Sequence, residues 1–507
     1  MRLISRVVIV SLIARAALAA PVAFTVSFAD SVRKESATGR VVVYLIKEGS
    51  SVGISSPSDG PFWYDPQPLY GVDVKDLRPG ETATLDDAAT AFGPKPSELK
   101  PGRYRAQAVL DVSRLDSSWK REPGNLFSDV VNIEVKPQGQ QSFAIPLKRT
   151  IERRPPKLAP GQEVFEVRSK LLSDFRKTDV MLRAGVVFPR EYDPARTYPA
   201  IYEVPGFGGN HLDGFHSRRR AAGTASELQR AAFYITLDPE SPNGHTLFAD
   251  SDVNGPCGEA LVKELIPALE AKYKLIAQPS ARLLRGHSSG GWSVLWLALA
   301  YPETFGACWS SSPDPVDFRR FELINIYDDP SAYADKNGND VPSTREGGKP
   351  TLSVRGENQQ EEVLGENNTS GQQWDSWQAV FGSRRADGWP ASLFDARTGK
   401  LDHAEAQHYK RYDIAHRLRE HPDKYGPIFL QRIRLICGDA DDFYLNEAVA
   451  LLKEDVDKLA IGELAEGRHG YVKMLPGLDH GSIFGSEAMR AFPQEMLDHL
   501  KRNGHAR

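Results

Sequence analysis

Gly286-His287-Ser288-Ser289-Gly290-Gly291 is the stretch that decides the fold. The short run Arg282-Leu283-Leu284-Arg285 before it predicts a buried strand, and the apolar run from Trp292 to Tyr301 after it predicts a helix. A serine between glycines on a tight turn from strand to helix is typical of a nucleophile elbow, which lifts the hydroxyl above a sheet. The alternative is a helix N-terminus at which Ser288 or Ser289 only bonds to the backbone.

A nucleophilic serine needs a base, and the base needs a carboxylate that orients it. In α/β-hydrolases the chain order is serine, acid, histidine. His480, in a loop near the C-terminus, is in the place of the base. The acid should follow a strand, and the strand 432–437 is followed by a loop with three candidates, Asp439, Asp441 and Asp442. Their spacing does not decide among them, and an aspartate-rich loop or a lone histidine can also be an ordinary surface feature.

The second half of an oxyanion hole should come from the loop after an earlier strand. Residues 198–204 predict that strand, and Pro205-Gly206-Phe207-Gly208-Gly209 follows it. Glycines let the backbone approach a substrate closely because they carry no Cβ. We therefore expect the backbone N–H groups of Phe207 and Ser289 to be the two oxyanion donors; the alternative is an ordinary turn.

Strands alternate with helices from residue 162 to residue 507, which predicts an α/β domain with a mostly parallel sheet. Residues 315–425 form a long polar insertion in it. Residues 20–146 instead contain β-branched and aromatic runs separated by Pro-Gly turns, which predicts an all-β, sandwich-like accessory domain. Residues 147–161 are basic and proline-rich, as in an extended linker.

Three further side chains are candidates for substrate contact. Trp374 and Trp377 in the insertion either line an aromatic substrate wall or form the insertion's own core. His245 lies in a loop between a predicted strand and the next helix, where the carboxyl ends of strands face the active site.

The N-terminus resembles a secretory signal. Arg2 and Arg6 precede an apolar run too short to span a bilayer, and Ala17-Leu18-Ala19 supplies a small-x-small cleavage pattern. We expect residues 1–19 to be a signal peptide and the protein to be periplasmic or secreted. The three cysteines, Cys257, Cys308 and Cys437, allow at most one disulfide, and the sequence leaves its pairing open.

Composition excludes several classes of protein. The 507 residues are 40% hydrophobic and 26% charged, unlike a polytopic membrane protein or a disordered chain. A net charge of −4 argues against nucleic-acid binding through bulk positive charge, and no membrane span is expected. Asp335, Asn337, Asn339 and Glu346 have EF-hand spacing, but Asp340 occupies the position that requires glycine. We expect no metal and no organic cofactor.

These motifs together resemble the putative-esterase branch of the α/β-hydrolases, which includes esterase D, the feruloyl esterases and the enterochelin esterases. The resemblance covers roughly residues 165 to 505 and rests on five motifs in order: Tyr198-Pro199, the elbow at 286–291, Tyr301-Pro302-Glu303-Thr304-Phe305, the acid loop and Asp479-His480. That branch carries its acid as Gly-x-x-Asp-x-Phe, which Gly438, Asp441 and Phe443 match; the resemblance therefore implies Asp441. Enterochelin-esterase relatives also carry an N-terminal β-sandwich. The long insertion departs from the compact members.

The resemblance and the residues together predict a serine esterase that cleaves a carboxylic ester through an acyl-enzyme, with Ser288, His480 and Asp441 as its triad. The substrate is expected to be a small-molecule or carbohydrate-linked ester; feruloyl, acetyl-polysaccharide, siderophore-lactone and lipid esters stay open. Two alternatives remain. One is an acyltransferase of the same fold, and the other is a catalytically idle binding protein.

Overall fold

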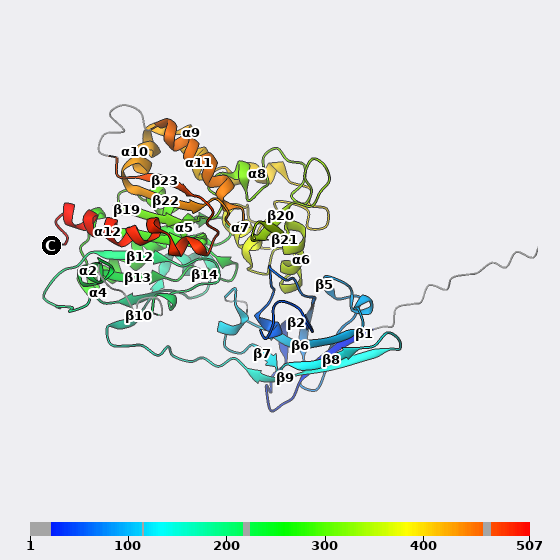
Figure 1. Cartoon of the computed structure of the whole chain (residues 1–507). Helices are drawn as coiled ribbons and strands as arrows, with labels where there is room; N and C mark the ends of the chain where they lie inside the picture. The colour runs from blue at the N-terminus through cyan, green and yellow to red at the C-terminus, as the bar shows by residue number, and fades with distance from the viewer. Residues whose placement is uncertain (1–21, 114–115, 216–223, 460–467, 507) are drawn as a thin grey trace, which may run out of the picture.

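The computed structural model describes residues 22–113, 116–215, 224–459 and 468–506. The predicted signal peptide, residues 1–19, lies outside these ranges. A β-rich domain lies beside an α/β domain, and an extended segment connects them (Figure 1). Within the described ranges, no helix has the length and apolar character needed to cross a membrane.

An eight-stranded sheet forms the centre of the α/β domain. Its first three strands in space pair antiparallel and the remaining pairs are parallel, so the mostly parallel sheet that the sequence predicts is confirmed. Residues in the central strands are buried on both faces, as a sheet covered by helices requires. In spatial order the strands are β10 (Gln162–Ser169), β11 (Val180–Val187), β13 (Phe233–Leu237), β12 (Ala200–Val204), β18 (Arg282–His287), β19 (Ala307–Ser311), β22 (Ile433–Gly438) and β23 (Tyr471–Leu475).

Helices cover the two faces of this sheet. Successive residues of β12 point to opposite faces: Tyr202 joins the larger apolar cluster and Ile201 the smaller one. The larger cluster packs under α4 (Ile266–Tyr273), α5 (Ser289–Ala300), α10 (Pro422–Arg432) and α11 (Leu445–Leu459). The smaller cluster packs under α2 (Thr224–Ala231) and α12 (Glu487–Arg502). Short helices α1 (Lys170–Arg176) and α3 (Cys257–Ala260), and the two-stranded ribbons β14 (Glu240–Ser241) with β15 (Gly244–His245) and β16 (Asp250–Ser251) with β17 (Gly255–Pro256), complete the frame.

The insertion at 315–425 is an integral part of the core. Its sequence is polar on average, but its aromatic side chains join the same large cluster as the sheet. Trp374 and Phe381 are at most 1% exposed. Its elements are β20 (Pro342–Glu346), β21 (Lys349–Ser353), α6 (Val354–Leu364), α7 (Gln373–Phe381), α8 (His403–Tyr409), α9 (Ile414–Glu420) and the start of α10.

The β domain contains nine strands in one hydrogen-bonded sheet. The short strand β7 bonds to β6 on one side and to β9 on the other, so the strands form a continuous sheet that folds over one apolar cluster. Phe24 of β1 stacks on Tyr70 of β3 within that cluster. The sandwich-like arrangement stays a prediction. Strand β9 runs to Thr150 and pairs over its length, so the extended linker spans 151–161 rather than 147–161. The strands are β1 (Val22–Phe28), β2 (Ala37–Lys47), β3 (Leu69–Leu77), β4 (Thr82–Leu85), β5 (Thr90–Phe92), β6 (Gly102–Asp111), β7 (Leu126–Ser128), β8 (Val131–Val135) and β9 (Gln141–Thr150).

Arg40 of β2 joins the β domain to the insertion. Its side chain is 1% exposed, and it donates to the carbonyl oxygens of Val363 at 2.7 Å and Glu362 at 3.0 Å, which end helix α6. Those carbonyls have no partner within their own helix, so the arginine caps it. A Cβ on Gly71 of β3 would lie 2.3 Å from the Val363 oxygen, so a glycine there permits the close approach.

Candidate active site

Ser288 occupies the turn between β18 and α5 with a strained backbone, φ 57° and ψ −128°. Non-glycine residues adopt such angles at a cost and mostly at functional sites. The flanking glycines make the turn possible. A Cβ on Gly286 would lie 2.1 Å from the Gly290 oxygen, and a Cβ on Gly290 would lie 2.0 Å from the Val204 oxygen. The turn therefore has the geometry of a nucleophile elbow.

Asp441 and His480 form a hydrogen-bonded pair. Asp441 follows β22 and is fully buried, and its Oδ2 lies 2.8 Å from Nδ1 of His480. Its Oδ1 accepts from the amide of Phe443 at 3.0 Å. Asp439, by contrast, accepts from the amide of Gly477 and so ties two loops together. Of the three candidate aspartates, Asp441 is the one whose carboxylate bonds to the imidazole of His480.

The pKa values of the two histidines of the site are shifted in opposite directions. Burial lowers the pKa of His480, but the charge of Asp441 and its hydrogen bond outweigh burial, so that pKa is raised above its usual value. Burial and the neighbouring His480 lower the pKa of His287 to about 3. His287 is thus neutral at working pH, and its ring lies 4.5 Å from that of His480.

The loop 205–209 meets the elbow at close range. A Cβ on Gly206 would lie 3.3 Å from the Cβ of Ser288. The amide of Gly209 donates to the oxygen of Gly206 at 3.0 Å, and Gly208 has φ +74°, which closes a tight turn around Phe207. This turn brings Phe207 to the cavity beside Ser288. Ser289 is the first residue of α5, where helical amides lack intrahelical partners.

The buried side chain of His245 holds this loop through a hydrogen bond. It is fully buried, and its Nδ1 accepts from the amide of Leu247 at 3.1 Å, so Nε2 carries the hydrogen and donates to the Pro205 oxygen at 3.0 Å. Burial lowers its pKa to about 4, which keeps the ring neutral. The expected substrate contact is therefore wrong: His245 has no surface that a substrate can reach.

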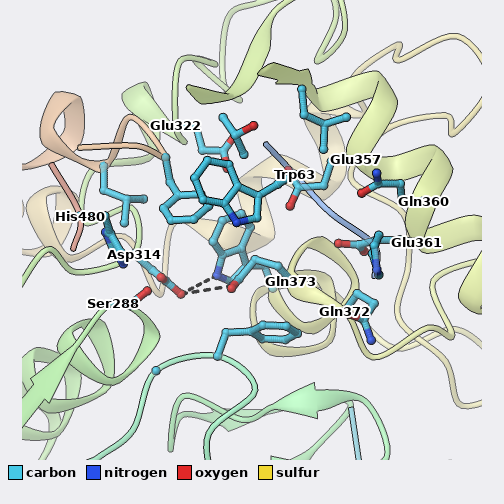
Figure 2. Close-up of a pocket in the computed structure, with 18 of the residues that line it drawn as sticks. Trp63, Ser288, Asp314, Glu322, Glu357, Gln360, Glu361, Gln372, Gln373 and His480 are labelled. Carbon is cyan, nitrogen blue, oxygen red and sulfur yellow. Dashed lines mark hydrogen bonds between the residues drawn. The ribbon is translucent and has the colours of Figure 1, made fainter. Parts of the chain in front are cut away.

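A cavity of about 430 Å³ opens above Ser288, and Figure 2 shows Ser288, Asp314 and His480 gathered at one end of it. Carboxyl and amide side chains face them from the insertion. No lysine or arginine is among the described residues that line it. The polar and aromatic lining consists of Trp63, Phe207, His287, Ser288, Asp314, Glu322, Thr344, Glu357, Gln360, Glu361, Gln372, Gln373, Trp377, Phe443 and His480.

The two tryptophans of the insertion have different roles. Trp377 lines the cavity, and its Nε1 donates to Oδ2 of Asp314 at 2.7 Å. Trp374 does not line the cavity; its ring packs against Phe321 and Phe394 in the core. The sequence left wall and core as alternatives, and the structure assigns one residue to each.

Trp374→Ala is expected to lower the free energy of unfolding by about 3–5 kcal/mol, because it opens a cavity in a packed aromatic core. The lower stability should reduce the measured activity on every ester by the same factor, because only the folded fraction is active. Thermal unfolding measured beside KM for a bulky and a small ester checks this. A selective rise in KM for the bulky ester at unchanged stability would show that Trp374 is a substrate contact after all.

Asp314 and Glu322 are pocket residues that the sequence reasoning missed. Burial raises the pKa of Asp314 to about 6, against the opposing bond from Trp377. Burial, with the neighbouring Glu357, raises the pKa of Glu322 well above its usual range. Asp314 follows the carboxyl end of β19. The expectation that site residues follow the ends of parallel strands, which indicated the acid loop, could therefore also have indicated Asp314. Glu322 has no comparable local signal.

The residues singled out as possible metal ligands or disulfide partners have other environments. There, no group of three histidine, cysteine, aspartate or glutamate side chains is arranged to hold a metal ion. The oxygens of Asp335 accept from the backbone and side chain of Asn339, as in a closed turn. Cys257, Cys308 and Cys437, all within the described ranges, are buried and unpaired.

The sheet, the elbow and the buried acid–histidine pair define an α/β-hydrolase fold. Residues 177–426 match the sequence model of the family named Putative esterase, which confirms the resemblance to the esterase branch and supports ester hydrolysis. The match includes Ser288 and the loop 205–209 and ends before Asp441 and His480.

Solved structures similar to this chain include a ferulic acid esterase, with 12% identity and a TM-score of 0.39 over 66% of this chain and 98% of that one. An S-formylglutathione hydrolase from Agrobacterium tumefaciens has 16% identity and a TM-score of 0.36, covering 68% and 97%. FphF, a fluorophosphonate-binding serine hydrolase of Staphylococcus aureus, has 12% identity and a TM-score of 0.37, covering 66% and 98%. No curated protein matches the sequence.

Proposed function

We propose that the protein is an exported serine esterase that hydrolyses a carboxylic ester through an acyl-enzyme. The observation that carries the proposal is the strained Ser288 at a strand-to-helix turn, in one cavity with His480, which Asp441 holds at 2.8 Å. The Putative esterase match supports the same reaction. Export rests on the signal-like residues 1–19 alone.

In the proposed reaction, Oγ of Ser288 attacks the ester carbonyl carbon while Nε2 of His480 takes its proton. The carbonyl oxygen becomes an oxyanion and accepts from the amides of Phe207 and Ser289. His480 then returns the proton to the leaving alkoxide, which departs as the alcohol. Water, activated by His480, next attacks the acyl-enzyme and releases the acid and free Ser288. Asp441 keeps Nδ1–H oriented and stabilises the imidazolium throughout.

A panel of aryl acetate, feruloyl, sugar-acetate and lactone esters assayed on the purified mature chain tests the proposal. Burst release of the alcohol followed by steady turnover is the result that an acyl-enzyme predicts. Added alcohols that capture most of the acyl group in preference to water would identify the alternative acyltransferase. No turnover and no reaction with a fluorophosphonate would instead fit the idle binding protein.

The cavity is lined by carboxyl groups and by no basic side chain among the described residues, which limits the charge that a substrate can carry. Asp314, Glu322, Glu357 and Glu361 line it, and burial raises the pKa of each. An anionic substrate group would be desolvated beside these carboxyls with no basic side chain to pair it. We therefore propose that the ester is neutral or cationic on the side that faces the insertion.

An aryl ester that carries a carboxamide is expected to have a kcat/KM about tenfold or more above that of its carboxylate analogue. The ratio should grow from pH 6 to pH 8, because Asp314, with a pKa of about 6, loses its proton over that range and the cavity becomes more negative. Steady-state kinetics on the two esters at several pH values measures it. Equal kcat/KM values, or a ratio that falls with rising pH, would contradict the proposed charge preference.

A further inference from the structure

We infer that the N-terminal β domain is part of the active site: Trp63 forms a wall of the ester-binding cavity, and Arg121 positions residues 205–209, which we call the oxyanion loop. The inference builds on the proposed esterase function and adds two residues from outside the α/β domain. The residues lie on two separate loops of the β domain, one before β3 and one after β6.

Trp63 faces the cavity from the loop before β3. Trp63 and the adjacent Pro61 are both cavity-lining residues. The Trp63 ring lies 5.5 Å from that of Phe443, whose ring lies 4.9 Å from that of His480. Figure 2 shows Trp63 above the cavity, between His480 and the carboxyls of the insertion. A substrate that reaches Ser288 therefore passes an aromatic face that the β domain supplies.

The loop that carries Trp63 is anchored within its own domain. Ser58 donates from its amide at 3.2 Å and from its hydroxyl at 2.7 Å to Oε1 of Gln107 on β6. Nε2 of Gln107 in turn donates to the oxygen of Ser128 on β7. All three side chains are buried. The tryptophan is thus held by the sheet of the β domain rather than by contact with the cavity alone.

Arg121 of the β domain bonds to the oxyanion loop of the α/β domain. Its Nη1 donates to the oxygen of Gly208 at 2.6 Å, and Nε bonds to Oδ2 of Asp116 at 2.8 Å. Glu240 of the α/β domain lies 3.7 Å from Nη2. Gly208 directly follows Phe207, so the arginine fixes the Gly208–Gly209 peptide, two peptide bonds after the one that carries the expected oxyanion donor.

The two domains hold the oxyanion loop between them. His245 of the α/β domain donates to the Pro205 oxygen, and Arg121 of the β domain donates to the Gly208 oxygen. These two carbonyls flank Phe207, whose amide is the proposed oxyanion donor. An oxyanion donor acts only within a narrow distance of the developing charge, and loss of one costs about 10²–10³ in kcat. Release of one side of its support is expected to cost less than complete loss.

Contacts across the same interface keep the β domain in this position. The amide of Ser117 donates to Oε2 of Glu240 at 3.0 Å, and its oxygen accepts from Nε2 of Gln372 at 3.0 Å. Gln372 also lines the cavity. Together with the Arg40 cap on α6, these bonds make the β domain a fixed wall of the site rather than a tethered module.

Arg121→Met should lower kcat by about tenfold for both an aryl acetate and a bulky ester, with KM changed by less than threefold. Arg121→Lys keeps the charge beside Asp116 and Glu240 but lacks the two-pronged geometry, and it should still lose kcat. Arg149→Met is the control, since Arg149 is an exposed arginine of the same domain. Rates are divided by the active-site concentration from end-point fluorophosphonate titration. Wild-type kcat in Arg121→Met, or full recovery in Arg121→Lys, would overturn the positioning role.

Trp63→Ala should lower the ratio of kcat/KM for a bulky ester to that for an aryl acetate by about tenfold. Trp389→Ala is the matched control, because Trp389 is a half-buried tryptophan away from the cavity lining. An unchanged ratio in Trp63→Ala, or an equal change in both variants, would overturn the wall assignment. If the Trp63 or Arg121 assignment is wrong, a fluorophosphonate should still label Ser288. If Ser288 of the wild-type chain is not labelled at all, the proposed esterase function itself is wrong.

Discussion

Ser288→Ala is expected to lower kcat by about 10⁴-fold or more while the chain stays folded. Removal of the nucleophile alone abolishes most of the catalysis in hydrolases built on this arrangement, and what remains comes from the oxyanion hole and binding. The change removes one oxygen and leaves the backbone of the elbow in place. Steady-state kinetics and thermal unfolding on the same preparation measure both effects.

Ser293→Ala is the matched control for this substitution. Ser293 lies one turn further along α5, is buried, and bonds to the Ser289 oxygen at 2.7 Å, so it shares the helix but not the cavity. Loss of the Ser293 hydroxyl should lower the free energy of unfolding more than it lowers kcat. More than about a tenth of wild-type activity in Ser288→Ala would show that another group is the nucleophile.

Asp441→Asn is expected to lower kcat by roughly 10⁴-fold, by analogy with the same change in other triads. The amide can donate a hydrogen to Nδ1 of His480 and so favours the wrong tautomer. Loss of the carboxylate also removes the charge that raises the pKa of His480. The acidic limb of the residual pH–rate profile should therefore move to lower pH.

Asp439→Asn and Asp442→Asn are the controls, and each should cost far less. Asp439 accepts from the Gly477 amide at 2.7 Å, and the asparagine side chain keeps an oxygen that can accept the same bond. Rates across pH 5 to 9 for the three variants distinguish them. If Asp439→Asn proves the crippling change, the assignment of the acid is wrong.

The parts of the site that the sequence could predict have strong local signals. The elbow requires two glycines around Ser288, and the structure shows the carbonyls that any side chain there would strike. The acid has a weaker signal, because three aspartates share one loop and the family pattern, not the spacing, favours Asp441. The geometry is consistent with that choice, since the Asp441 carboxylate bonds to His480.

The parts that sequence could not predict depend on contacts between distant segments. Trp63 and Arg121 lie in the β domain, and each is more than 80 residues away in sequence from the residue it contacts, Phe443 and Gly208 respectively. No local sequence pattern marks either of them. The place of His245 in the chain predicts a substrate contact, but its side chain turns to the Pro205 oxygen. The insertion is polar on average because its exposed residues outnumber the aromatic ones that join the core.

Mapping of the covalent adduct that a fluorophosphonate forms with the full chain tests the central claim most directly. Intact-mass spectrometry should show one adduct per wild-type chain, and fragmentation should place it on Ser288; Ser288→Ala should carry none. The reaction should slow as pH falls and His480 takes a proton. An adduct on a different residue, or no adduct on a folded wild-type chain, would contradict the account.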